Sequence, residues 1–249
     1  DTSHDSLFKT KWLNQFVGSW FCAYPTWQDL RRYRHHHWLH HKNAGSSADP
    51  DISLVQAFPI SRASLFRKIL RDLTGLSALK RIYGLLLMDL GFIKYTVANE
   101  TVWLDQSQMT LRKRLRMAVQ NLHGVVVTNL LLFLILNFLR LEHAYLLWVL
   151  SYLTTFSVIV RIRSIAEHAG TVMDLDPFKS TRTTLANFFA RVTVAPHRVN
   201  YHLEHHLLMT APYFQLPKIH ALLRERGALE NAFVSPSYVN VLKDVTTSS

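Results

Sequence analysis

Two distant stretches of the chain repeat one spacing of histidines. The pattern H-x-x-H-H occurs as His37, His40 and His41, and again as His202, His205 and His206. Positions i, i+3 and i+4 of an α-helix lie on one face, because each turn takes about 3.6 residues. We therefore expect each motif to direct its three imidazoles to one point. Neutral imidazole is a good ligand for iron, zinc and copper, so two facing triplets predict a site for one or two metal ions.

The first motif lies in a run of five histidines at positions 35–41, but the run does not have the form of a purification tag. It is internal, and Trp38 and Leu39 interrupt it. Two copies of H-x-x-H-H in a chain with 14 histidines also argue against a chance arrangement.

Composition indicates a membrane protein with basic surfaces. The chain has 249 residues, of which 49% are hydrophobic, and a formal net charge of +11. Such surfaces suit anionic lipid or acidic partners. Nucleic acid is the competing partner, but no nucleic-acid-binding module is recognisable. The single cysteine, Cys22, excludes an intramolecular disulfide framework and a cysteine-based zinc or iron–sulfur site.

Two apolar stretches, residues 117–139 and 144–160, predict a transmembrane helical hairpin with a short connector. Basic residues flank the pair at 112–116 and at 161–163, whereas the connector holds one arginine. The positive-inside rule then places both flanks in the cytoplasm. Both histidine motifs would lie on that same side.

The remaining segments predict shorter elements. Residues 1–30 favour an interfacial amphipathic helix, or the exit of a transmembrane helix, with a break at Pro25. Residues 43–51 are rich in turn formers and predict a loop. Residues 61–80 predict a basic helix at the membrane surface, residues 82–97 an interfacial segment, and residues 217–226 a surface helix.

Taken together, these motifs resemble those of the membrane fatty acid desaturase superfamily, which also contains fatty acid hydroxylases and carotenoid ketolases and hydroxylases. The family has three histidine boxes, of which the last two read H-x-x-H-H and are separated by a membrane hairpin. The stretches at 200–207 (Asn-Tyr-His-Leu-Glu-His-His-Leu) and 216–220 (Leu-Pro-Lys-Ile-His) also resemble the family's third box and its surroundings. The resemblance covers nearly the whole chain.

The resemblance implies an all-α integral membrane protein with a helical cap that holds a histidine-rich di-metal site. It implies one domain over residues 1–249, with a transmembrane hairpin at 117–160 and cap segments at 31–116 and 161–249. The family's first box often reads H-D-x-x-H, and this chain begins Asp-Thr-Ser-His4. His4 would be the second histidine of that box. We therefore expect the first histidine, and an upstream hairpin, to precede Asp1.

The same resemblance implies a set of site residues. The expected metal ligands are His4, His37, His40, His41, His168, His202, His205 and His206. His168 lies between the last span and the third box, where the family can place a further ligand. Ser164 stands where some members have an asparagine that contacts the site through water. Residues expected to support the ligands by hydrogen bonds are Ser164, Asn200, Asp49 and Asp174, with Asp51, Asp176 and Glu204 as further carboxylates. Residues expected to steer an acidic electron donor, or to contact anionic lipid, are Arg31, Arg32 and Arg34.

The implied function is that of an O2-dependent desaturase with two non-haem iron ions, acting on an acyl-lipid or acyl-thioester from the cytoplasmic side of a membrane. A ferredoxin or a b-type cytochrome would supply electrons. Hydroxylation of fatty acids, or ketolation or hydroxylation of carotenoids, is the alternative within the superfamily. A metal transporter would need ionisable residues within its spans, and residues 124–139 have none. A zinc hydrolase would need fewer histidines around a single tetrahedral site.

Overall fold

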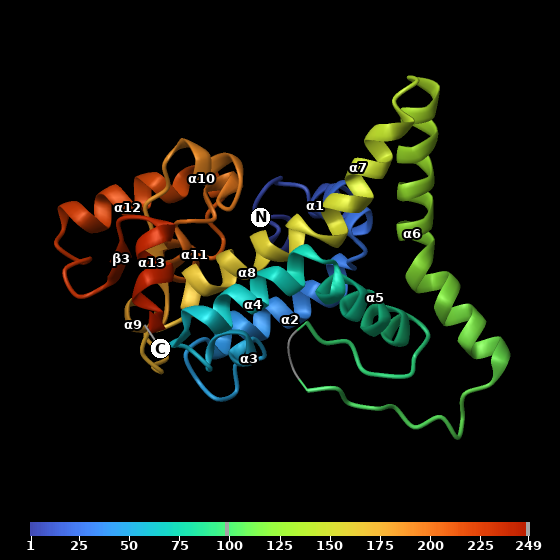
Figure 1. Cartoon of the computed structure of the whole chain (residues 1–249), viewed down its shortest axis with the longest axis horizontal. Coiled ribbons are helices and arrows are strands. Elements are labelled where there is room, and N and C mark those ends of the chain that lie inside the picture. The colour runs from blue at the N-terminus through green and yellow to red at the C-terminus, as the bar shows by residue number, and fades with distance from the viewer. Residues whose placement is uncertain (98–99, 248–249) are drawn as a thin grey trace.

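A long helical hairpin extends from a body of shorter helices (Figure 1). The computed structural model describes residues 1–97 and 100–247. The α-helices are α1 (Lys11–Val17), α2 (Leu30–Asn43), α3 (Ile52–Val55), α4 (Arg62–Leu73), α5 (Leu76–Asp89), α6 (Leu111–Phe138), α7 (Glu142–Leu153), α8 (Thr155–His168), α9 (Pro177–Ser180), α10 (Phe188–Val192), α11 (His202–Leu207), α12 (Leu216–Glu225) and α13 (Tyr238–Asp244). Short 3-10 turns are η1 (Thr2–His4), η3 (Tyr24–Thr26), η4 (Pro196–Arg198) and η5 (Tyr213–Gln215), and Gly18–Ala23 form a π-helical segment, η2.

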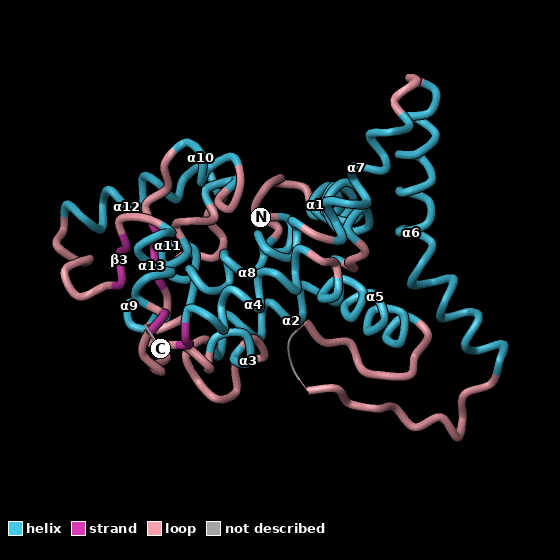
Figure 2. Tube along the Cα trace, viewed as in Figure 1, coloured by secondary structure: helices cyan, strands magenta, loops and turns pink. Residues whose placement is uncertain are grey.

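Four very short strands also form, which the expected all-α class did not include. The strand β1 (Ile60–Ser61) pairs in parallel with β4 (Thr246–Thr247), and β2 (Arg182–Thr184) pairs in parallel with β3 (Phe233–Ser235). Strands of two or three residues are too short to show a period-2 pattern in a sequence. The fold is therefore mostly helical, with two small parallel pairs (Figure 2).

The hairpin consists of α6 and the nearly continuous pair α7–α8. Both are long and apolar enough to cross a membrane: Leu111–Phe138 has 28 residues and a mean hydropathy of 1.8 in its most apolar window, and Glu142–His168 has 27 residues and 1.6. These helices are longer than the predicted spans at 117–139 and 144–160. In the most apolar window of each helix, only 6% of the residues are buried. The buried residue of α6 is Gly124, against which the Tyr24 ring packs so closely that an added Cβ would lie 2.3 Å from it.

Three other segments differ from their predicted extent. The basic helix expected over 61–80 is divided into α4 and α5, because Gly75 has a φ of +81°, which favours glycine and ends the first helix. The interfacial segment expected at 82–97 is helical only as far as Asp89, and a loop follows (Figure 2). Within residues 1–30, α1, the π-helical segment η2 and the turn η3 follow one another without a gap, and η3, which contains Pro25, ends this helical stretch.

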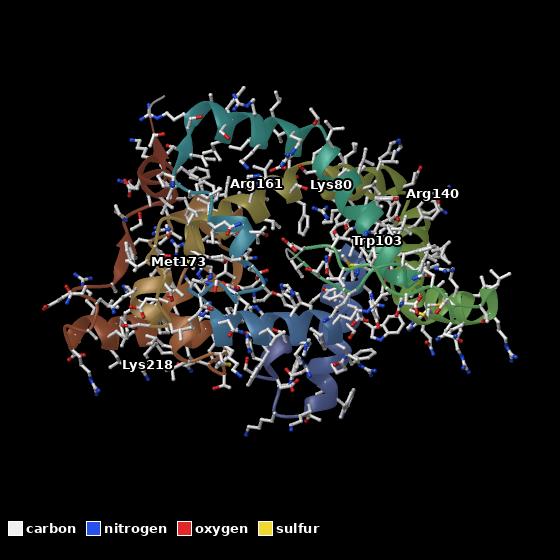
Figure 3. The ribbon with its side chains drawn as sticks, turned by 90° about the horizontal axis from the view of Figure 1, so that it is seen from below. Lys80, Trp103, Arg140, Arg161, Met173 and Lys218 are labelled. Carbon is white, nitrogen blue, oxygen red and sulfur yellow. The ribbon has the colours of Figure 1, made fainter. Side chains whose placement is uncertain are left out.

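The body is held together around α8, which packs against α4 and α13. The buried cluster on these helices consists of Leu65, Ile165, Ala166, Ala169, Val241 and Val245. Beside it, Asp72 of α4 is fully buried and accepts hydrogen bonds from Arg161 Nη2 of α8 at 2.9 Å and from Ser77 Oγ at 2.5 Å. Arg161, labelled in Figure 3, is half-buried. Burial opposes the charge on Asp72, but the hydrogen bonds from Arg161 and Ser77 outweigh it and lower the pKa of the carboxyl group.

We predict that Asp72→Asn destabilises the protein by about 2 kcal/mol, because Arg161 then loses the carboxylate that neutralises it in a partly buried place. The melting temperature of the detergent-solubilised protein should fall by about 4–8 °C at pH 7. The difference should shrink as the pH falls through the lowered pKa of Asp72, since protonation removes the ion pair in the parent protein too. Asp105→Asn is the matched control, because Asp105 is exposed and bonds only to nearby Ser107. Equal melting temperatures for the parent protein and Asp72→Asn would contradict the role given to this ion pair.

Candidate metal centre

Four separate elements bring the eight expected histidines together. The first motif lies on α2, whose Asp29 N-cap accepts a hydrogen bond from the Arg32 amide at 2.9 Å. The second motif lies on α11, His168 is the last residue of α8, and His4 ends the turn η1. The ring nitrogens fall into two groups of four, and within each group they lie within 4.8 Å of one another.

The first histidine group consists of His4, His37, His41 and His205. The Nε2 atom of His41 lies 3.2 Å from that of His37 and 3.1 Å from that of His205. The His4 ring lies 4.9–5.0 Å from the other three ring centroids. Its Nε2 atom is buried without a hydrogen-bond partner among the described residues.

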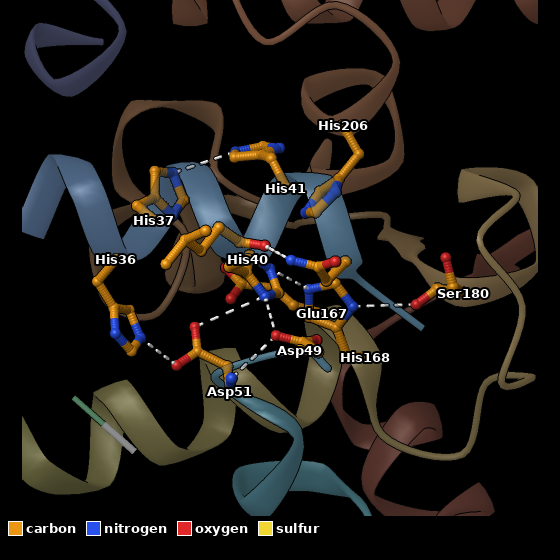
Figure 4. A network of polar contacts seen from close by, with 12 residues as sticks. His36, His37, His40, His41, Asp49, Asp51, Glu167, His168, Ser180 and His206 are labelled. Carbon is orange, nitrogen blue, oxygen red and sulfur yellow. Dashed lines mark hydrogen bonds and ion pairs between the residues drawn. The ribbon is translucent and has the colours of Figure 1, made fainter. Parts of the chain in front are cut away.

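The second histidine group consists of His40, His168, His202 and His206. The Nε2 atom of His168 lies 3.2 Å from that of His40 and 2.8 Å from that of His202, which in turn lies 3.1 Å from Nε2 of His206. The two groups are adjacent, since the ring centroids of His41 and His206 are 4.2 Å apart. Figure 4 shows members of both groups along α2.

This division corrects the expectation that each H-x-x-H-H motif directs three rings to one point. His37 and His41 contribute to the first group and His40 to the second, whereas His205 contributes to the first and its neighbours in the motif to the second. Adjacent residues of a helix are rotated by about 100°, so two consecutive histidines cannot face the same centre. Each motif therefore serves both groups, with two rings in one and one ring in the other.

The distances and the protonation of the rings fit a bound metal ion. His168 Nδ1 lies 3.0 Å from the carbonyl oxygen of Ser180, which only accepts, so this nitrogen carries the proton. In the neutral ring, Nε2 then carries a lone pair, and this atom faces the other rings of its group. Two nitrogens at 2.0–2.1 Å from one metal ion would be about 2.9–3.4 Å apart, close to the separations found here.

Burial keeps most of these imidazoles neutral, as metal binding requires. Burial, reinforced by neighbouring rings, lowers the pKa of His205 to about 3 and the pKa of His41 to about 2. Burial also lowers the pKa of His4 to about 4. It lowers the pKa of His37, His202 and His206 well below the usual value. His40 differs, because the hydrogen bond and charge of Asp49 outweigh burial and raise its pKa.

Carboxylates contact the outward side of the rings. Asp49 is buried and accepts a hydrogen bond from His40 Nδ1 at 2.8 Å, which leaves Nε2 of that ring directed to the second group (Figure 4). Asp51 Oδ2 lies 3.6 Å from the same Nδ1, and Glu167 Oε1 lies 3.8 Å from Nδ1 of His202. These contacts orient the ligating rings and do not occupy the points that the Nε2 atoms face.

Half-buried Arg34 and buried Arg182 hold the elements that carry His4 and His168. Arg34 Nη2 donates to Thr2 O and to Asp5 Oδ1, each at 2.8 Å, and so fixes the turn η1 against α2. Arg182 of β2 donates to Ile165, Ala166 and Ala169 carbonyls at the end of α8, at 2.7–3.4 Å. A cation at a helix C-terminus satisfies carbonyls that lack intrahelical partners. Both arginines thus hold elements that end in site histidines.

The other expected residues have different surroundings. Arg34 is engaged as described and Arg32 is paired with Asp89 at 2.8 Å, so of the three arginines expected to steer an electron donor only Arg31 is exposed. Asp174 is paired with Lys179 at 2.7 Å rather than with a site histidine. Asp176 caps α9 by accepting from the Phe178 amide.

The last two expected supporting residues lie near ligands without contacting a ring nitrogen. Ser164 lies half-buried in α8, four residues before His168. Asn200 is buried and donates to the Thr184 carbonyl at 3.0 Å, so it joins the second motif to β2.

Two further contacts involve histidines that lie outside both groups. His36 is buried, and its Nε2 lies 2.8 Å from Asp51 Oδ1. His220 of α12 lies with Nδ1 2.5 Å from Oε1 of Glu204, whose side chain is fully buried. For the contact of His220, the sequence did contain a signal, because Glu204 stands between the histidines of the second motif. A carboxylate at that position is buried with the motif and needs a hydrogen-bond donor, which His220 provides.

Comparison with known proteins agrees with this geometry. The family model for fatty acid desaturases matches residues 1–237. A dihydrorhizobitoxine desaturase from Bradyrhizobium elkanii is 28% identical over 225 residues, which cover 88% of this chain and 60% of that protein. The chain thus spans about 60% of the length of the curated relative that it matches. With nearly the whole chain matched and all eight expected histidines gathered in two groups, the chain belongs to the fatty acid desaturase family.

Proposed function

We propose that this protein is an O2-dependent membrane desaturase that introduces a C=C bond into the acyl chain of a lipid or thioester. The observation that carries the proposal is the arrangement of eight buried or half-buried histidines in two adjacent groups of four. We assign one iron ion to each group. Imidazole suits iron, and two adjacent ions suit a reaction that removes two hydrogens.

The residues of the chain have defined tasks in this reaction. Iron bound in the two groups, supplied with O2 and two electrons, would provide the oxidising power needed to remove hydrogen from an unactivated C–H bond. The buried rings offer neutral nitrogens. Asp49 holds a proton on Nδ1 of His40, and the Ser180 carbonyl does the same for His168, so that both rings keep Nε2 available.

The surroundings of the rings disfavour a zinc hydrolase. Such an enzyme needs a general base beside a metal-bound water. Among the described residues, the carboxylates of Asp49, Asp51 and Glu167 approach the ligating rings at Nδ1, on the side away from the two groups. Eight histidines also exceed the ligands of one tetrahedral site.

We further propose that α6 and α7–α8 cross the membrane as a hairpin, with the histidine groups on its cytoplasmic side. The support lies in the length and hydropathy of both helices and in their exposed apolar side chains. Arg161 and Arg163 are paired with Asp72 and Glu167 inside the body, so they contribute less to the orientation than their number suggests. The orientation rests on the exposed basic residues Arg112, Lys113 and Arg116 at the start of α6.

A ferredoxin or a b-type cytochrome is our proposed electron donor, with Arg31, which is exposed and lies six residues before His37, as the candidate docking cation. The identity of the substrate is proposed separately from the reaction. The matched relative is named for dihydrorhizobitoxine, which supports a second candidate, desaturation of a substrate other than an acyl chain. Hydroxylation and ketolation differ from desaturation in the fate of the second hydrogen, and the product distinguishes them.

We predict about two iron ions per chain in the whole protein after purification with iron loading, because each histidine group offers four imidazole nitrogens. His205→Ala should lose iron mainly from the first group and His206→Ala from the second, so each should retain about one ion. Elemental analysis by mass spectrometry measures this. The matched control is His35→Ala, since His35 is exposed on α2 and belongs to neither group. Stoichiometric zinc with no iron would contradict the proposed centre.

We predict new unsaturated fatty acids in a host that expresses the whole protein together with a compatible electron donor. His205→Ala should reduce their amount by at least about 100-fold, because the first group then loses a ligand. Mass spectrometry of total fatty acids measures the product and locates its double bond. New hydroxy acids would contradict desaturation and show that the protein hydroxylates its substrate. An unchanged profile with iron bound would reject an acyl substrate and favour the second candidate.

A further inference from the structure

Glu204 lies between His202 and His205 in the sequence, and its carboxylate is fully buried. Its Oε2 accepts a hydrogen bond from Thr183 Oγ1 of β2 at 2.5 Å, and its Oε1 accepts one from His220 Nδ1 of α12 at 2.5 Å. The exposed fraction is 0% for Glu204 and for Thr183, and the His220 side chain is 14% exposed. Burying a carboxylate is costly unless its oxygens are hydrogen-bonded, and here each oxygen has a donor.

The helix that carries Glu204 depends on contacts with other elements for its orientation. The helix α11 has six residues, and its N-cap residue Tyr201 makes no side-chain capping hydrogen bond. A helix this short gains little from its own hydrogen bonds, so tertiary contacts must hold it. At about 100° per residue, Glu204 points roughly 150° away from the mean direction of His202, His205 and His206. Glu204 therefore fixes the face of α11 that lies opposite the face with the three rings.

The division of the second motif makes the rotation of α11 important for both histidine groups. His205 belongs to the first group, whereas His202 and His206 belong to the second. A rotation of α11 about its axis would displace rings from both groups at once. The two anchors of Glu204 come from separate elements, β2 and α12, and β2 is itself paired with β3. Two anchors on different sides restrain rotation, whereas one would allow pivoting.

We propose that Glu204, held by Thr183 and His220, is a positioning residue that sets the rotation of α11 and so places ligands for both metal ions. This inference rests on the metal centre proposed above. It assigns a role to His220, which lies outside both groups and whose Nδ1 bonds to the carboxylate. Loss of either donor should weaken metal binding at both groups together, although neither donor is a ligand.

The test is a titration of the metal-free whole protein in lipid nanodiscs with Co2+, followed by the visible absorption of the bound ion. We expect His220→Ala to weaken binding of both ions by about 10–100-fold, as loss of support for metal ligands typically does. His220→Asn keeps an N–H donor where Nδ1 lies and should restore affinity to within about threefold. Lys218→Ala, an exposed change on the same helix (Figure 3), is the matched control and should bind as the parent protein does.

Each outcome bears on the inference. Parent-like affinity in His220→Ala would overturn it, and so would equal weakening in His220→Asn, because the hydrogen bond would then not be the cause. If His220→Ala does not fold, as judged by size-exclusion elution, Thr183→Val removes the other donor without changing the shape and should show the same loss. Failure of the parent protein to bind two ions would instead reject the proposed metal centre and this inference with it.

Discussion

The structure depends on the cost of bringing eight imidazole rings together with their nitrogens facing inward. Neighbouring Nε2 atoms are 2.8–3.2 Å apart, and the rings are removed from solvent, so charged imidazoles would repel one another at short range. Two conditions remove this cost. The rings must be neutral, as in His40 and His168, whose outer nitrogens donate to Asp49 and to the Ser180 carbonyl, and the cation proposed above would lie among the inner nitrogens. The rest of the body serves to hold the rings in this arrangement.

Polar contacts, more than apolar packing, hold the elements that carry the ligands. The apolar cluster lies on α4, α8 and α13, beside the site. The short strand β2 is buried throughout, and each of its residues bonds to an element that bears ligands: Arg182 to the end of α8, Thr183 to Glu204 of α11, and Thr184 to Asn200 just before α11. Arg34 similarly joins η1 to α2. Buried hydrogen bonds have narrow geometric requirements, which suits ligands that must keep a fixed distance from a metal ion.

Local spacing predicted much of the site, and contacts between distant segments decided the rest. Helical periodicity identified His37, His40 and His41 as candidate ligands, and the family resemblance added His4 and His168; all five lie in the two histidine groups. The division of each motif between two groups depends on where η1 and α8 lie, and no spacing within a motif contains that information. Arg32 and Arg34 looked like surface charge, because the count of basic residues does not show which of them have partners such as Asp89 and Asp5. The break between α4 and α5 did have a local signal, Gly75, whereas strands of two or three residues had none.

We propose that each histidine group binds one iron ion and that imidazole nitrogens are the only ligands that the protein supplies. Iron-edge X-ray absorption of the iron-loaded whole protein tests it most directly, because imidazole rings give a characteristic scattering pattern from their outer ring atoms. We expect about four imidazole nitrogens per iron at about 2.0–2.2 Å, with additional light-atom ligands allowed at open positions. A first shell with two or fewer imidazoles per iron, or one containing sulfur, would contradict it.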